Sequence, residues 1–201
     1  MQDGWEVFQN PRSNMKKLIA LSILSLSLYA SDEPAQIELS IDEQKALVEQ
    51  MEKNKDAPGA VIFTPPQNWK MVDPKALPKH VLVMIIGTGQ GDFPPNMNLG
   101  YEKYAGSAKD FIRKVVKTEL DASHADWKNL GTVQTKAGIA ELIQVDTKTK
   151  WGQERQMQAF IKNEDTIYIL TASALRSEFP TYYKEFFESI RSLSINPSEK
   201  K

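Results

Sequence analysis

The stretch from His80 to Phe93, HVLVMIIGTGQGDF, has the residue types of a nucleotide-binding loop: an apolar run followed by glycines at positions 87, 89 and 91. A dinucleotide fingerprint needs the spacing G-x-G-x-x-G and a helix that contains the third glycine. Here the spacing is G-x-G-x-G, and Asp92 and the prolines at 94 and 95 follow. The prolines prevent a helix from starting there, and the Asp92 carboxylate would repel a phosphate. We therefore expect a connection between two strands, with Gly89 and Asp92 as candidate contacts for a partner or ligand.

The residue types that commonly catalyse reactions form no recognisable motif. The sequence has two histidines, His80 and His124, and no cysteine, and neither histidine shows the spacing of a metal ligand. No serine lies in a G-x-S-x-G elbow, and Ser107 is expected to cap a helix. We therefore expect no catalytic residue, cofactor or metal site, and a hydrolase is the least favoured alternative.

Aromatic residues provide the remaining candidate contacts. Trp151 follows a short turn and is flanked by Lys150 and Gly152, so it either contacts a partner or lies over the sheet edge. The last helix carries an aromatic stripe in which Tyr183 and Phe186 are candidate ligand contacts. Such stripes more often belong to a hydrophobic core. Ligand contact and core packing are therefore kept as alternatives for the stripe.

Composition limits the class of protein. The chain has 201 residues, of which 41% are hydrophobic and 25% charged, which suits one domain with appended segments. Its 25 basic and 26 acidic residues give a net charge of −1, so nothing favours nucleic acid or an anionic membrane as partner. The absence of cysteine from the sequence excludes disulfides and a cysteine-linked lipid anchor.

The amino-terminal region predicts export. Met15-Lys16-Lys17 precedes a short apolar run that ends at Ala30, a pattern typical of a secretory signal peptide and too short for a good membrane span. We expect residues 1–30 to be leader and signal peptide, with Met15 as the hypothetical true start. The mature protein would then be periplasmic or secreted, without a stable membrane span.

The elements predict an α+β fold. Residues 31–59 form a polar lead with a single helix over 41–53, residues 60–196 form the domain, and 197–201 form a polar tail. Helices are expected over 108–120, after a capping box at Ser107, and over 179–190.

Between these helices the hydrophobic period is two, and the gaps are too short for parallel crossovers, so neighbouring strands must be antiparallel. The run 81–86 and the strand that starts at 166 are apolar on both faces and need cover on both sides. The prediction is a three-layer α/β/α sandwich with a largely antiparallel sheet flanked by helices. The four successive strands are expected over residues 127–135, 139–147, 151–162 and 166–173.

From Pro66 to Ser192 the order of elements resembles the PsbP-like superfamily, which includes PsbP and exported bacterial domains of the DcrB type. The resemblance is carried by P-x-x-W before the first long strand, by W-x-x-L-G-x-x-x-T from Trp127 to Thr135, and by the closing strand and aromatic helix, IYILTASAL and EFPTYYKEFFESIRSL. It implies the same sandwich and no shared active site, so no functional residue carries over. Many bacterial relatives are lipoproteins, whereas this chain has no lipobox cysteine.

The resemblance implies an exported, non-catalytic binding or assembly domain of the cell envelope, with an envelope protein as its partner. The alternative is a small-molecule or lipid carrier with a pocket between the sheet and the C-terminal aromatic helix.

Overall fold

The computed structural model describes residues 36–37, 61–89 and 93–195. The predictions for residues 1–30, for the helix over 41–53, for Asp92 and for the tail at 197–201 lie outside the described residues. Gln36–Ile37 form a short strand, β1, within the segment expected to be a polar lead with one helix.

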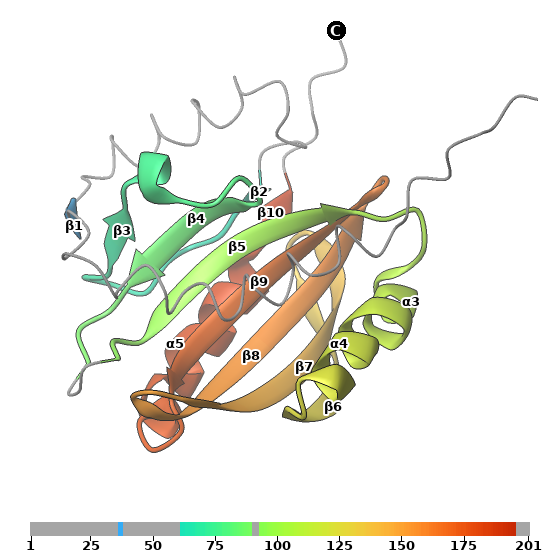
Figure 1. The fold of residues 1–201 in the computed structure, drawn as a ribbon. Coiled ribbons are helices and arrows are strands. Elements are labelled where there is room, and N and C mark those ends of the chain that lie inside the picture. Colours follow the sequence, from blue (N-terminus) through green and yellow to red (C-terminus); the bar gives the residue numbers. More distant parts are fainter. Residues whose placement is uncertain (1–35, 38–60, 90–92, 196–201) are drawn as a thin grey trace, which may run out of the picture. The chain divides into compact units, whose positions relative to one another are not determined.

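The described chain forms a large antiparallel sheet (Figure 1). Its strand order is β1-β3-β4-β5-β9-β8-β7-β6, and every pairing in it is antiparallel. A second small sheet pairs β2 (Val61–Ile62) with β10 (Ser194–Ile195). The large sheet contains β1, β3 (Lys70–Val72), β4 (Val81–Ile86), β5 (Asn96–Lys103), β6 (Asp126–Thr135), β7 (Gly138–Thr149), β8 (Gly152–Asn163) and β9 (Thr166–Leu175).

Both helices predicted for the domain are present. The first runs through α3 (Ala108–Phe111), a wide π-type segment η2 (Ile112–Val116) and α4 (Lys117–Ala122). Ser107 caps it as expected, because its hydroxyl accepts a hydrogen bond of 3.1 Å from the backbone N–H of Asp110. The second is α5 (Phe179–Ser192), with Pro180 in its first turn, where the missing N–H has no cost. A short 3-10 turn, η1 (Pro74–Ala76), precedes β4.

The two helices cover opposite faces of the sheet (Figure 1). On one face α5 contributes Phe186 and Ile190 to a core that includes Met97 and Met157 of β5 and β8. On the other face Phe111 of α3 packs on Phe160 of β8, with ring centroids 6.1 Å apart. The α+β fold and the three-layer α/β/α arrangement predicted from the sequence are thereby confirmed.

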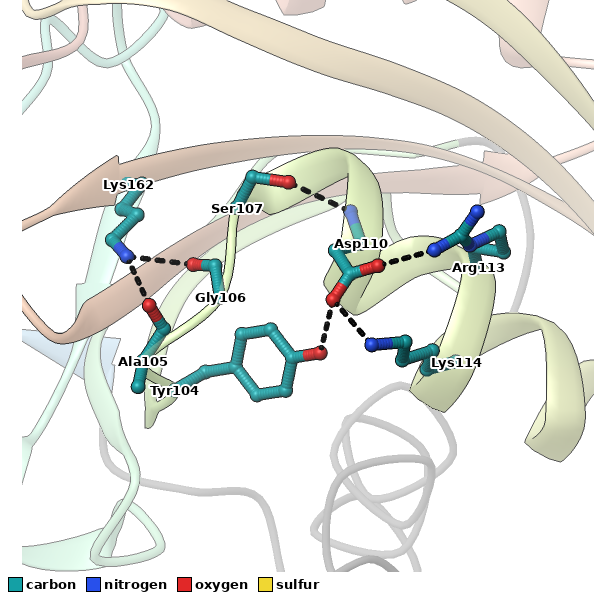
Figure 2. Close-up of polar contacts among 8 residues, drawn as sticks. All are labelled: Tyr104, Ala105, Gly106, Ser107, Asp110, Arg113, Lys114 and Lys162. Atoms are coloured by element: carbon teal, nitrogen blue, oxygen red, sulfur yellow. Dashed lines mark hydrogen bonds and ion pairs between the residues drawn. The ribbon is translucent and has the colours of Figure 1, made fainter.

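A polar network determines where the first helix begins (Figure 2). Asp110 accepts a hydrogen bond of 3.1 Å from the Tyr104 hydroxyl and pairs with Arg113 at 2.6 Å and Lys114 at 2.8 Å. The hydrogen bonds from Lys114, Arg113 and Tyr104 lower the pKa of Asp110 to about 2, against an opposing contribution from burial.

The strand before the helix is anchored in the same region. Lys162 of β8 donates hydrogen bonds of 2.7 Å to the carbonyl oxygens of Ala105 and Gly106 (Figure 2). These contacts connect the β5–α3 link to a central strand, so we assign this network a structural role.

Candidate functional site

Seven polar side chains lie together on one face of β5, β9 and β8, and we call them the polar row. Each belongs to a buried residue, with at most 7% of its surface exposed. The face is the one that α3 covers further along β8, since Gln158 and Phe160 are two residues apart on that strand. The polar row comprises Asn96, Asn98, Glu154, Gln156, Gln158, Thr171 and Ser173.

The strand register explains why these side chains are neighbours. Ser173 of β9 lies opposite both Asn96 of β5 and Gln156 of β8. Thr171 likewise lies opposite Asn98 and Gln158. Because side chains alternate between the faces of a strand, residues two apart extend the same row, and Glu154 follows Gln156 in this way.

A directional chain of amide hydrogen bonds ends at Glu154. Gln158 Nε2 donates to Gln156 Oε1 at 2.8 Å, and Gln156 Nε2 donates to Glu154 Oε1 at 2.9 Å. Both amide donors therefore point toward the carboxylate, an arrangement that stabilises its negative charge.

Several atoms of the polar row have no hydrogen-bond partner. They include Glu154 Oε2, Asn96 Oδ1 and Asn98 Nδ2. The other amide atom of Asn96, Nδ2, donates to the Pro94 carbonyl at 3.2 Å. Buried polar atoms without partners are rare in folded proteins, because each costs about 1–3 kcal/mol. A ligand of matching hydrogen-bond chemistry could pair with these atoms.

Burial raises the pKa of Glu154, and the hydrogen bond from Gln156 opposes the rise. The Ser173 hydroxyl also lies close enough to oppose it, although its geometry falls short of a hydrogen bond. The adjacent Arg155 alternates to the other face, where it holds Asp146 through bonds of 2.7 and 2.6 Å and lowers the pKa of that carboxyl. Among the described residues no basic side chain forms an ion pair with Glu154.

Trp151 and the glycine loop meet at one end of the polar row. The Trp151 ring lies 5.7 Å from the ring of Phe93, which is almost fully buried. Phe93 lies three residues before Asn96, and Trp151 lies three residues before Glu154. Trp151 belongs to the β7–β8 turn rather than to the predicted strand, because β8 begins at Gly152 with a φ of +130°. The structure thus places the candidate Trp151 against Phe93 at the end of the glycine loop, a contact that the sequence does not predict.

The glycine loop connects β4 to β5, as predicted. The Gly87 N–H donates to the Pro95 carbonyl at 2.8 Å and closes the loop. A Cβ atom on Gly89 would lie 2.9 Å from Pro95 Cδ, so this half-buried position tolerates no larger residue without a shift. Gly89 therefore permits close packing of the loop on its own prolines.

The two candidates on α5 have different environments. Phe186 is fully buried between Trp69 and Phe179, with ring centroids 5.8 and 5.3 Å away. Tyr183 is 49% exposed and stacks on Phe187. The aromatic stripe is thus core at Phe186 and surface at Tyr183.

Two hollows lined by described residues lie away from Tyr183 and Phe186. One, of about 450 Å³, is at the end of β8 and β9 and is lined by Trp151, Gln153 and Arg176 among others. The other, of about 440 Å³, lies between the β6–β7 turn and α5 and is lined by Lys136, Glu188 and Arg191 among others. The carrier alternative gains no support from either of them.

The histidines occupy separate surroundings. His80 precedes β4 and packs its ring against Tyr101 at 5.9 Å, whereas His124 is exposed after α4 with a φ of +54°. Within the described ranges, no group of three or more His, Cys, Asp or Glu side chains could hold a metal ion.

A second exposed feature is the hairpin of β6 and β7, which we call the edge hairpin. β6 is the last strand of the described sheet on that side. Its register with β7 shifts between Asn129 and Gly131, a β-bulge in which Gly131 has a φ of +89° and donates to Asn129 Oδ1 at 2.7 Å. The bulge leaves Leu130 41% exposed, and Ile139 at the start of β7 is 66% exposed.

The turn of the edge hairpin is fixed to the end of α5. The N–H of Lys136 donates to Arg191 O at 3.3 Å, and that of Ala137 donates to Leu193 O at 2.9 Å. The exposed apolar side chains therefore extend from a rigid support.

The polar row was not predicted from the sequence. Its signal is the alternation of polar residues in Glu154-x-Gln156-x-Gln158, together with Asn96-x-Asn98 and Thr171-x-Ser173. The spacing of the apolar residues alone does not indicate this pattern, because an apolar or charged residue separates each polar residue from the next.

None of the helices formed by the described residues is long and apolar enough to cross a membrane.

The fold has counterparts among solved structures, although no family model and no curated protein matches the sequence. LpqN, a protein involved in cell envelope biogenesis of Mycobacterium tuberculosis, superposes with a TM-score of 0.51 at 16% identity, covering 71% of this chain and 88% of LpqN. Cyanobacterial PsbP from Synechocystis gives 0.49 at 15% identity, over 68% of this chain and 86% of PsbP. The Ran-binding protein Mog1p of Saccharomyces cerevisiae gives 0.46 at 13% identity, over 68% of this chain and 90% of Mog1p.

At 16% identity the likeness to LpqN shows the fold alone, and the two lower scores carry no argument of their own. The domain therefore shares with LpqN the α+β fold that the order of its sequence elements predicts.

Proposed function

We propose that this protein is a non-catalytic binding or assembly domain of the cell envelope that acts through protein–protein contacts. The observation that carries the proposal is the edge hairpin, where Leu130 and Ile139 are large apolar side chains exposed beside an edge strand. Such side chains gain free energy when a partner covers them, at roughly 25 cal/mol per Å² of apolar surface.

The geometry of the edge hairpin also fits a protein partner. An edge strand has backbone donors and acceptors that an extended partner segment can pair with. The bulge at Leu130 interrupts this edge, which limits indiscriminate strand pairing and directs one apolar side chain outward. A selective contact, rather than aggregation, is the expected result.

The envelope location is supported by two independent considerations. The amino-terminal sequence predicts export, and the structural neighbour LpqN is described as involved in cell envelope biogenesis. The fold itself is compatible with many functions. The proposal therefore rests on the exposed residues of the edge hairpin and not on the fold.

The test compares proteins captured from the native envelope by the wild-type chain and by the double variant Leu130→Asp/Ile139→Asp. We expect the variant to lose at least one partner that the wild type retains, because each charge would be buried in the contact. Tyr183→Asp is the control, since it places one such charge on another exposed position, 49% exposed, on α5. Equal capture by all three chains would reject the edge hairpin as the contact.

A further inference from the structure

We propose that the polar row binds an ammonium group, carried by a free amine or by a lysine side chain of a partner. The site lies on β5, β9 and β8, away from the exposed residues of the edge hairpin, and nothing in the proposed protein contact requires it. Each proposal can therefore fail while the other holds.

Hydrogen-bond chemistry is the first argument. Glu154 Oε2 and Asn96 Oδ1 are unpaired acceptors, and Ser173, whose hydroxyl is also unpaired, lies on the strand between them. An ammonium group has three donors and no acceptor, which matches this set of oxygen atoms. The unpaired donor, Asn98 Nδ2, belongs to a residue two positions after Asn96 on β5, further from Glu154. It is not needed for the match.

Charge is the second argument. Glu154 is fully buried, and a buried carboxylate is stable in the ionised form only beside a cation or strong donors. The amide chain from Gln158 through Gln156 directs both of its donors toward this carboxylate, so part of the stabilisation already exists. A positive charge at Oε2 would complete this stabilisation.

An organic cation fits better than a metal ion. Calcium takes six to eight oxygen ligands, commonly from several carboxylates, whereas the polar row contains one carboxylate. The aromatic pair Phe93 and Trp151 at the end of the row offers ring faces that attract ammonium groups. Lys150 Nζ lies 4.2 Å from the centroid of the Trp151 ring, so one cation of the chain already lies over that ring.

A hollow lies beside this end of the polar row, although none of the residues named in its lining belongs to the row. The hollow of about 450 Å³ at this end of the sheet is lined by Trp151, Gly152 and Gln153, the residues directly before Glu154 on β8. The positive charge of Arg176 in the same hollow is partly compensated, because its Nε lies 3.7 Å from Asp146.

The test is calorimetric titration of the full chain with butylammonium, using Glu154→Gln and Glu141→Gln as paired variants. Both variants exchange a carboxylate for an amide of the same shape. Glu141 lies on the same sheet face but is only partly buried, which makes it the matched control. We expect binding by the wild type and by Glu141→Gln, and at least about tenfold weaker binding by Glu154→Gln, since a charge-assisted hydrogen bond is lost.

An unchanged melting temperature in Glu154→Gln would exclude unfolding as the cause of weaker binding. No binding of butylammonium by the wild type, or equal binding by Glu154→Gln, would overturn the proposal.

A second titration identifies the source of the ammonium group. Nα-acetyl-lysine N-methylamide has the same amine on a backbone that must stay outside the site. If it binds as well as butylammonium, the site accepts a lysine side chain of a protein; if it is rejected while butylammonium binds, the ligand is a free amine. Both results require the same Glu154 dependence.

Discussion

Replacing Phe186 by alanine is expected to unfold the domain more readily rather than to empty a ligand pocket. The Phe186 side chain is completely buried and contacts the rings of Trp69, Phe179 and Tyr182 at centroid distances of 5.8, 5.3 and 6.0 Å. It therefore connects α5 to the sheet and to the segment that precedes β3. Removing it leaves a cavity that the surrounding rings can fill only in part.

The expected loss follows from this complete burial. Phe→Ala substitutions at buried sites reduce the free energy of unfolding by about 3–5 kcal/mol. For a chain of this size, each kcal/mol lowers the melting temperature by about 2–4 °C, so the total shift is roughly 6–20 °C. Urea denaturation followed by near-ultraviolet circular dichroism measures the loss directly. Tyr183→Ala is the control, because that side chain is 49% exposed and its removal should cost much less.

A loss below about 1 kcal/mol in Phe186→Ala would refute this reasoning, because a fully packed aromatic side chain cannot be removed so cheaply. It would mean that α5 lies less tightly on the sheet than the structure shows. The carrier alternative would then regain support, since a loosely covered face leaves room for a ligand.

Three further predictions concern charge and backbone. The pKa of Asp110 is lowered to about 2, so its ion pairs should stabilise the fold fully above the ordinary pKa of an aspartate, near 4, and lose this effect as the pH falls toward 2. Asp110→Asn should therefore make stability depend less on pH between about 4 and 2. Urea denaturation at several pH values measures this. Because burial raises the pKa of Glu154, ionisation of this side chain opposes folding above that raised pKa. Without a ligand, Glu154→Gln should therefore be as stable as the wild type or more stable at about pH 7. This difference in stability should become smaller in acid. Gly131→Ala should cost about 1–2 kcal/mol, through its φ of +89° alone, because nothing lies within 4 Å of the new Cβ. Gly87→Ala should cost more, since its Cβ would lie 2.6 Å from Trp69 Cε2. Equal melting temperatures for the two glycine variants would contradict the packing described for that ring.

The architecture was predictable because its determinants are local. Gaps of two or three residues between β6, β7, β8 and β9 permit only antiparallel neighbours, and this follows from chain geometry alone. Both helices followed from the hydrophobic period, and the start of the first also followed from the Ser107 cap, which the structure confirms. The strand after the glycine loop, which is β5, followed from the interpretation of that loop as a connection between two strands.

The site was less predictable because it depends on register and on helix coverage. The polar row exists only because β5, β9 and β8 align Asn96, Ser173 and Gln156, a relation between distant segments that periodicity cannot give. Periodicity also placed Tyr183 and Phe186 on one stripe, whereas a helix lying on a sheet buries only part of that stripe. The meeting of Trp151 and Phe93 is likewise a tertiary contact between two turns.

The most direct test of the proposed function is site-specific photo-crosslinking from the edge hairpin in the native envelope. A photoreactive amino acid at position 130 or 139 should give a discrete adduct of protein size, because both side chains are exposed and apolar. The same residue at position 183, which is also exposed, should not give that adduct. Adducts from position 183 alone, or the same adduct from all three positions, would contradict a protein contact at the edge hairpin.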